Sequence, residues 1–244
     1  MNSVRSRDGT VIAFARSGSG DPLVMVHGTS GDKTRWRMVL PQLQSQFTVY
    51  AIDRRGRGES GDVQPYALER EFEDAVAVVD AIDKPVNLLG HSHGAICALE
   101  AGSRTTNLKR LILYEPPISL GGPMYPPAAL VRLRELQKAN DREGILRTFF
   151  TEIVRMPPQE LQKMQSLPTW PARVAAAHTL VREVEISETF RFDEERARRI
   201  TVPTLLLLGG DSPPIFRLPI EKLAATIPNS RVVVLPGQQH IAMD

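Results

Sequence analysis

A glycine-flanked serine follows a short apolar run near the middle of the chain. Residues 86–89 (Val-Asn-Leu-Leu) lead into Gly-His-Ser-His-Gly at residues 90–94, and a helix-forming stretch, residues 95–101, follows at once. A sharp strand-to-helix turn brings backbones close together, and glycine tolerates this crowding. A serine at the apex of such a turn has its hydroxyl pushed out above the sheet. This context favours Ser92 as a nucleophile over an ordinary turn serine.

The length and composition indicate a globular protein and argue against a nucleic-acid-binding one. A chain of 244 residues with 42% hydrophobic content can bury a full core as one large domain, or as one domain with an inserted subdomain. Its 30 basic and 28 acidic residues give a net charge of +2, and no basic run interleaves with aromatic residues. We therefore expect no nucleic-acid partner. The single cysteine, Cys97, excludes an intramolecular disulfide and predicts a small buried side chain.

The first residues contain no apolar stretch that could serve as a signal peptide. No segment of the sequence approaches the length of a membrane span either. From these observations we expect a cytoplasmic protein with no membrane partner.

Short apolar runs alternate with segments of helical periodicity over most of the chain. After an N-terminal hairpin signal at residues 8–9, apolar runs cover residues 22–27, 48–53, 86–89, 108–114, 204–208 and 231–235. Helical spacing separates several of them, at residues 36–47, 67–82 and 214–227. Continuously apolar strands are buried on both faces, as in a parallel sheet covered by helices. The predicted fold class is α/β, with helices on both faces of the sheet.

This alternation stops in the segment 118–200, where helical patterns occur without a strand candidate. Apolar residues recur at helical spacing over residues 130–136, 146–153 and 174–184. Asn140 with Glu143 predicts a capped start for the second of these helices. We therefore divide the chain into an α/β core, residues 1–117 and 201–244, and an all-helical insertion, residues 118–200.

A serine hydroxyl becomes a good nucleophile only when a base removes its proton. Of the five histidines, His240 follows the last predicted strand, in a loop at that strand's carboxyl end. Catalytic groups and ligands gather at this edge of a parallel sheet, so we expect His240 to be the base. His91 and His93 flank Ser92 in a turn that directs them away from it, and His178 lies on an insertion helix.

A histidine base works best when a carboxylate fixes its tautomer, and two carboxylates follow strands at the same edge. Asp211 comes after the apolar run 204–208 and two glycines, and Glu115 comes directly after the run 108–114. Asp211 could equally cap the helix that begins near Pro214. We take Asp211 as the triad acid and Glu115 as its competitor.

The predicted strand that ends at His27 is followed by Gly28 and Thr29. A glycine at such a position lets a backbone amide face a negative oxygen at close range. We expect the oxyanion donors to be the amides of Thr29 and of His93, the residue after the nucleophile.

Together these motifs resemble the α/β-hydrolase family, in the family's own order. The motifs are His27-Gly28, residues 53–60 (Asp-Arg-Arg-Gly-Arg-Gly-Glu-Ser), residues 90–94, Gly209-Gly210-Asp211 and Gly237-Gln238-Gln239-His240. The resemblance implies an eight-stranded, mostly parallel sheet, a Ser-His-Asp triad, no cofactor or metal, and a helical cap that shapes the substrate pocket. We interpret the 53–60 loop as a structural hallmark rather than a catalytic one.

The sequence departs from the family pattern at two places. Asp211 lies two residues after Gly209, where the family's acid usually lies three residues after its glycine. The sequence ends four residues after His240, where the family continues into a final helix. The first departure keeps Glu115 as an alternative acid. From the second we expect either a shortened chain or a protein without that helix.

The expected activity is hydrolysis of a carboxylic ester-type bond in a small to medium hydrophobic small-molecule substrate. The acyl group would pass through Ser92. The same triad could instead hydrolyse a lactone, a thioester or a carbon–carbon bond, or catalyse perhydrolysis. The sequence leaves these alternatives open, because a fold does not determine a substrate. The alternative from another class is a non-catalytic ligand-binding relative. The sequence predicts no oligomeric state.

Overall fold

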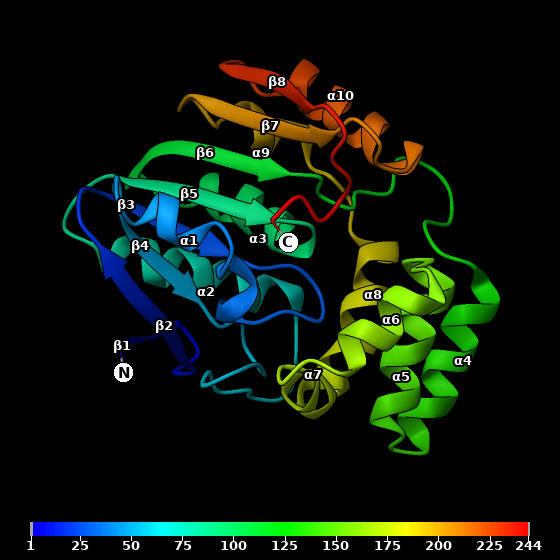
Figure 1. Cartoon of the computed structure of the whole chain (residues 1–244). Coiled ribbons are helices and arrows are strands. Elements are labelled where there is room, and N and C mark those ends of the chain that lie inside the picture. The colour runs from blue at the N-terminus through cyan, green and yellow to red at the C-terminus, as the bar shows by residue number, and fades with distance from the viewer. Residues whose placement is uncertain (1, 244) are drawn as a thin grey trace.

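One eight-stranded sheet organises the computed structural model, which describes residues 2–243 (Figure 1). Its strands are β1 (Asn2–Arg5), β2 (Val11–Gly18), β3 (Asp21–Val26), β4 (Phe47–Ile52), β5 (Val86–His91), β6 (Leu108–Tyr114), β7 (Thr204–Gly209) and β8 (Ser230–Leu235). They lie in the order β1-β2-β4-β3-β5-β6-β7-β8. β2 pairs antiparallel with β1 and β4, and the remaining neighbours pair parallel. The predicted α/β class and mostly parallel sheet are confirmed.

The central strands are buried on both faces, as their continuous apolar sequences predict. One face packs under α2 (Leu68–Asp80), α3 (His93–Gly102) and α10 (Arg217–Thr226), which share the largest apolar cluster with it. The other face packs under Trp36, α1 (Leu40–Leu43) and the segment 241–243. Cys97, on α3, is buried among apolar residues, which confirms the prediction of a small buried side chain.

The segment 36–47 is less helical than its spacing predicts. The structure has a 3₁₀ turn, Lys33–Trp36, and then only the single-turn helix α1. Pro41 lies in the first turn of α1, where its missing amide hydrogen costs nothing. In the interior of a longer helix the same residue would break a hydrogen bond, so the prediction of one helix over this segment is wrong.

Between β6 and β7 the described chain forms helices and no strand. They are α4 (Pro127–Lys138), α5 (Arg142–Thr148), the π-turn Phe149–Ile153, α6 (Pro158–Gln165), α7 (Trp170–Ala176), α8 (Leu180–Thr189) and α9 (Glu194–Arg198). Helices α4 to α8 enclose an apolar cluster of their own, separate from the clusters of the sheet. We call residues 127–189 the helical insertion. It lies beyond the arrowheads of the parallel strands in Figure 1.

Two helix predictions within the insertion need correction. The N-cap of α5 is Asp141, whose carboxylate accepts the Gly144 amide at 2.8 Å, whereas Asn140 takes a positive φ of 54°. The single helix predicted over 174–184 consists of α7, the 3₁₀ turn Ala177–Thr179 and α8. In addition, α6 buries only Leu161, which leaves too little apolar periodicity for prediction.

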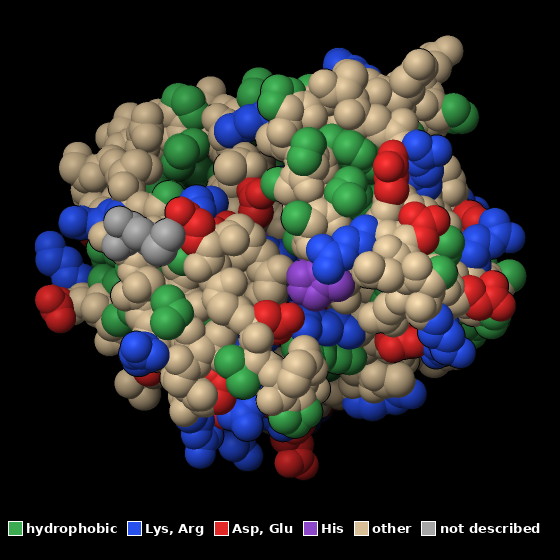
Figure 2. Space-filling view, turned by 90° about the horizontal axis from the view of Figure 1, so that it is seen from below, with side chains coloured by type: hydrophobic (Ala, Val, Ile, Leu, Met, Phe, Trp, Pro, Cys, Tyr) green, Lys and Arg blue, Asp and Glu red, His purple; other side chains and the backbone are tan. Residues whose placement is uncertain are grey.

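The surface carries charges of both signs. Figure 2 shows Lys and Arg side chains interspersed with Asp and Glu on the face that it presents, in keeping with the small net charge of +2. Among residues 2–243, no helix is long and apolar enough to cross a membrane.

Candidate active site

Ser92 lies at the turn between β5 and α3, in the strand–turn–helix context that the sequence predicts. Its φ of 54° and ψ of −126° are strained for a residue with a side chain. The flanking glycines are required by crowding. A Cβ on Gly90 would lie 2.3 Å from the Gly94 carbonyl oxygen, and one on Gly94 would lie 2.3 Å from the Val26 carbonyl oxygen. The turn therefore presses α3 directly against the ends of β3 and β5.

Backbone strain is concentrated at the carboxyl edge of the sheet. Within residues 2–243, five non-glycine residues have positive φ, and three of them are Ser30, Ser92 and Glu115. Each of these three follows a parallel strand by one to four residues. Strained residues persist where the surrounding structure holds them, and they cluster at functional sites. The strain thus independently indicates the edge at which the sequence places its catalytic candidates.

The carboxylate that meets His240 is Glu115. Its Oε2 lies 2.6 Å from Nδ1 of His240, and its Oε1 accepts the Gly209 amide at 2.7 Å. The Glu115 side chain is fully buried, whereas that of His240 is 22% exposed. Because the carboxylate accepts from Nδ1, the proton of a neutral His240 sits there and Nε2 is left as the base.

Glu115 is also tied to the serine turn. The Ser92 amide donates to the carbonyl of Tyr114, the residue before Glu115, at 2.9 Å. The Glu115 amide donates in turn to the Leu207 carbonyl of β7 at 3.3 Å. The backbone therefore connects the end of β6 to the turn that carries Ser92.

Asp211, our first choice of acid, does not make this contact. Its side chain is exposed, and its amide donates to the Gln238 carbonyl at 2.9 Å. Gly209 ends β7 and Gly210 follows it before the chain reaches Asp211, while Glu115 follows its strand directly and lies between Gly209 and His240. The structure corrects the expected acid contact from Asp211 to Glu115, the competitor that the sequence left open.

Three further side chains hold the loop of His240. Nε2 of His91 donates to the His240 carbonyl oxygen at 2.7 Å, and the Tyr114 hydroxyl donates to the Gln239 carbonyl. The Phe216 ring stacks on the His240 imidazole, with ring centroids 4.1 Å apart and planes 8° apart. Burial, with the nearby His240, holds the pKa of His91 well below its ordinary value, so His91 is a neutral donor. Sequence reasoning missed this contact, because it predicts only that His91 points away from Ser92.

The segment that follows β3 runs beside the serine turn. A Cβ on Gly28 would lie 2.9 Å from the Ser92 Cβ, so only a glycine fits there. Thr29 comes next in the chain and is half-buried. His93 is the first residue of α3, and its amide has no acceptor within the helix. His93 therefore follows Ser92 in the chain, and Thr29 follows the glycine that lies against Ser92. The role of their amides as oxyanion donors stays a prediction.

A group of buried charges lies behind these strand ends. The Arg54 guanidinium donates to both oxygens of Glu71, at 2.7 and 3.2 Å, and pairs with Glu183 of α8 at 2.7 Å. Arg57 also pairs with Glu183 at 2.7 Å. Burial alone would raise the pKa of Glu183, but Arg54 and Arg57 outweigh it and lower this pKa to about 2. Both glutamates are therefore ionised at neutral pH, since Arg54 also holds the pKa of Glu71 well below its ordinary value.

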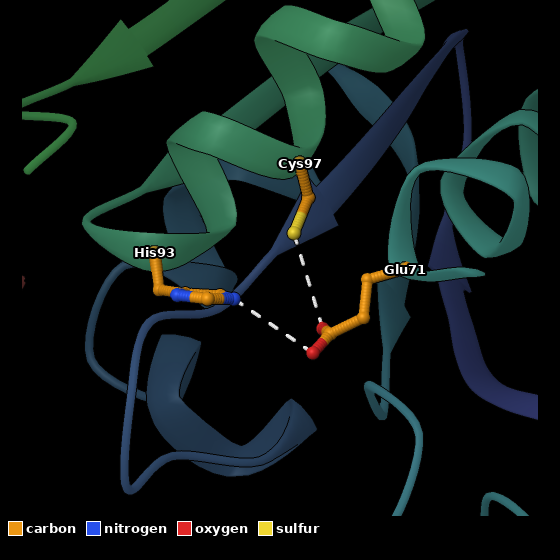
Figure 3. Close-up of side chains that lie close together, drawn as sticks. All are labelled: Glu71, His93 and Cys97. Atoms are coloured by element: carbon orange, nitrogen blue, oxygen red, sulfur yellow. Dashed lines mark hydrogen bonds and ion pairs between the residues drawn. The ribbon is translucent and has the colours of Figure 1, made fainter. Parts of the chain in front are cut away.

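Glu71, His93 and Cys97 offer three potential metal ligands within 4.8 Å of one another (Figure 3). Nε2 of His93 lies 3.7 Å from Glu71, and Sγ of Cys97 lies 3.9 Å from it. The Glu71 carboxylate already accepts from Arg54 and from the Tyr66 hydroxyl, so an added cation would lie beside a guanidinium. Burial raises the pKa of the Cys97 thiol well above its ordinary value, and metals bind the thiolate. The surroundings disfavour a cation here.

Comparison with known proteins shows what the chain is similar to. The model of the alpha/beta hydrolase family matches residues 23–244. A solved alpha/beta hydrolase from Sphaerobacter thermophilus is 40% identical with a TM-score of 0.85, covering 98% of this chain and 94% of that one. A thermophilic esterase from Thermogutta terrifontis is 26% identical with a TM-score of 0.71, covering 98% and 91%. The uncharacterized hydrolase YraK of Bacillus subtilis is 26% identical over 213 residues, which cover 84% of this chain and 76% of YraK.

The family match therefore covers the sheet from within β3 to β8, the serine turn, the helical insertion and the His240 loop. It agrees with the strand order and with the position of Ser92 between β5 and α3. The chain belongs to the alpha/beta hydrolase family, and it is a hydrolase.

Proposed function

We propose that this hydrolase cleaves carboxylic ester-type bonds, with Ser92 as nucleophile, His240 as base and Glu115 as acid. One observation carries the proposal: a fully buried carboxylate contacts Nδ1 of His240 at the sheet edge that also holds the strained Ser92 turn. A buried carboxylate on Nδ1 is the arrangement that orients a histidine for proton transfer at Nε2. Glu115 takes the role that the sequence assigned first to Asp211.

In the proposed reaction, the Ser92 hydroxyl oxygen attacks the ester carbonyl carbon while Nε2 of His240 takes the hydroxyl proton. The amides of Thr29 and His93 hold the negative oxygen that results. His240 then gives its proton to the leaving alcohol, and an acyl group remains on Ser92. A water molecule, deprotonated by His240, attacks this acyl group. The bond between the acyl carbon and the Ser92 oxygen then breaks, His240 returns the proton to that oxygen, and the acid is released. Glu115 stabilises the charged imidazole in both halves of the reaction.

We propose a small to medium hydrophobic ester as the substrate. Phe216 stacks on the His240 imidazole and the neighbouring Ile215 side chain is 39% exposed, so apolar surface borders the base. The similarity to a thermophilic esterase supports an ester over other acyl bonds. We also propose that residues 118–200 act as a cap over a core formed by residues 1–117 and 201–244, because helices α4 to α8 lie beyond the strand ends.

A fluorophosphonate probe tests this proposal on the whole chain. Mass spectrometry of the labelled protein should find the phosphonyl group on Ser92, and Ser92→Ala should abolish both labelling and hydrolysis of a nitrophenyl ester. Folded wild-type protein that neither labels nor hydrolyses the ester would instead support the ligand-binding alternative. Equal hydrolysis by wild type and Ser92→Ala would exclude Ser92 as the nucleophile.

A further inference from the structure

The loop of residues 27–31, which we call the oxyanion loop, is held through its backbone carbonyls by arginines. Three guanidinium groups donate to it: Arg54 to the His27 carbonyl at 3.4 Å, Arg173 to the Ser30 carbonyl at 2.5 Å and Arg57 to the Gly31 carbonyl at 3.3 Å. Arg173 also donates to the Ser30 hydroxyl at 3.3 Å. Ser30 has a positive φ of 61°, which is strained for a residue with a side chain. The hydrogen bonds from Arg173 help to hold this conformation.

All three arginines contact or belong to the helical insertion, and Arg54 is also paired with Glu71 of α2. Arg173 is itself a residue of α7, and Arg54 and Arg57 both pair with Glu183 of α8. Glu183 is fully buried, and its Oε1 lies 2.7 Å from a nitrogen of each arginine. Insertion and oxyanion loop are therefore joined by charge-assisted hydrogen bonds, which are stronger and more directional than apolar contacts.

The peptide between Gly28 and Thr29 carries the amide that we propose as an oxyanion donor. Its carbonyl oxygen lies 2.8 Å from Nδ1 of His27 and accepts the Gly31 amide at 3.4 Å. Nε2 of His27 accepts the Arg54 amide at 3.1 Å, which leaves the proton of His27 on Nδ1. Because a peptide group is planar, holding this carbonyl also sets the direction of the Thr29 amide.

We infer that the helical insertion sets the geometry of the oxyanion hole, with Arg173 and Glu183 as its positioning residues. The inference rests on the proposed function and extends it. Arg173 fixes the Ser30 peptide directly. Glu183 acts through Arg57, which holds Gly31, and through Arg54, which holds His27. An insertion that is displaced would therefore weaken the hold on the oxyanion, and the loss would appear in the transition state rather than in substrate binding.

The inference predicts that variants of these positioning residues have a lower kcat. The substrate should be too small to be bound by the insertion, so that a change in substrate binding does not contribute. With nitrophenyl acetate, Arg173→Met should lower kcat about 10- to 100-fold with little change in KM, a smaller loss than the ~100- to 1,000-fold for removing an oxyanion donor outright. Arg173→Lys keeps the positive charge and a donor, and it should recover part of the loss. Arg132→Met is the matched control, since Arg132 is an exposed arginine of the same insertion, paired with Glu152.

A trifluoromethyl ketone separates positioning from general destabilisation. Ser92 adds to its carbonyl, His240 takes the serine proton, and the resulting hemiketal oxygen carries the negative charge that the oxyanion hole holds. Arg173→Met should raise the inhibition constant of this ketone by about the factor by which kcat/KM falls, with Arg132→Met unchanged. Glu183→Gln should also raise the inhibition constant of the ketone. Circular dichroism gives the folded fraction of this variant, and the constant is measured on the folded protein.

Two results would overturn the inference. One is a wild-type kcat in Arg173→Met, and the other is a fall in kcat with an unchanged inhibition constant, which would leave Arg173 a merely structural role. Failure of the proposed function looks different, because wild-type protein would then show neither fluorophosphonate labelling of Ser92 nor ester hydrolysis.

Discussion

The ends of β6 and β7 each carry a carboxylate at the same edge of the sheet, and the two side chains meet different surroundings. Glu115 is fully buried, contacts His240 and accepts a backbone amide of β7, whereas Asp211 is exposed. The chain reaches Asp211 only after two glycines, while Glu115 follows its strand directly at a strained φ of 45°. The comparison teaches that a carboxylate's surroundings, rather than its place in a motif, indicate which acid a base uses.

The largest expected effect that tests this comparison comes from Glu115→Gln. Loss of the carboxylate removes the partner that keeps the proton on Nδ1 of His240 and stabilises its charged form. We expect kcat to fall about 1,000- to 10,000-fold, by analogy with the asparagine exchange in a serine protease triad. Stopped assays on a nitrophenyl ester measure it, with thermal unfolding as a check that the variant folds. Near-normal activity would return the role of acid to Asp211.

A second prediction compares how much a buried and an exposed carboxylate contribute to the free energy of unfolding. Glu183→Gln leaves Arg54 and Arg57 without their shared charge in a buried place, so the free energy of unfolding should fall by about 3–5 kcal/mol at neutral pH. Urea titration measures it. The matched control is Glu143→Gln, which breaks an exposed pair with Arg147 and should change stability by less than about 1 kcal/mol. Equal effects of the two substitutions would contradict the contrast.

The same glutamate should give the protein part of its sensitivity to acid. The pKa of Glu183 is about 2 in the folded protein and near 4.5 in its ordinary state, so the unfolded chain binds its proton first. Its stabilising contribution is complete above about pH 4.5 and is lost as the pH falls toward 2. Unfolding free energies measured over this range should fall less steeply in Glu183→Gln than in wild type, and parallel slopes would exclude this role.

A fourth prediction concerns the anchors of the His240 loop. His91→Phe keeps a ring of similar shape and removes the hydrogen bond to the His240 carbonyl, so we expect kcat to fall about 10-fold, equivalent to about 1.4 kcal/mol, with KM nearly unchanged. His91→Gln retains a nitrogen donor and should recover part of the activity. Leu111→Ala, a buried change elsewhere in the sheet, should lower the melting temperature without lowering the kcat of folded protein. The same behaviour in His91→Phe would reduce His91 to a packing residue.

The smallest expected effect completes the comparison. Asp211→Asn removes an exposed carboxylate, and kcat should stay within about twofold of wild type because surface changes away from special contacts are close to neutral. Steady-state kinetics measure the kcat of Asp211→Asn and of Glu115→Gln under the same conditions, and the two values together decide between the acids. A large loss in Asp211→Asn together with a small one in Glu115→Gln would reverse the assignment.

The sequence predicted those features that repeat or that sit in tight local geometry. Apolar runs predicted the strands, because burial on both faces leaves a continuous pattern. The flanking glycines predicted the Ser92 turn, because crowding there excludes larger residues. Both signals are local in the chain.

Other features depend on contacts between distant residues and had no local signal. The choice between Glu115 and Asp211 depends on a hydrogen bond across 125 positions of the sequence. Arg54 and Arg57 stand in a motif interpreted as structural, but nothing near them in the chain shows that their partner is Glu183 on α8. The prediction of one helix over residues 36–47 was wrong for a different reason. The apolar spacing there is helical, but Pro41 confines α1 to a single turn.

The joint between insertion and sheet also limits how this hydrolase can be re-engineered. Arg54 and Arg57 stay behind if the insertion is exchanged for that of a relative, and both then lose the carboxylate of Glu183. A graft chosen only for its pocket would leave Arg57 without a carboxylate in the interior and Arg54 with Glu71 alone. Loop 53–57 and helix α8 therefore form one transplantable unit, and a chimera that moves them together keeps its charges paired.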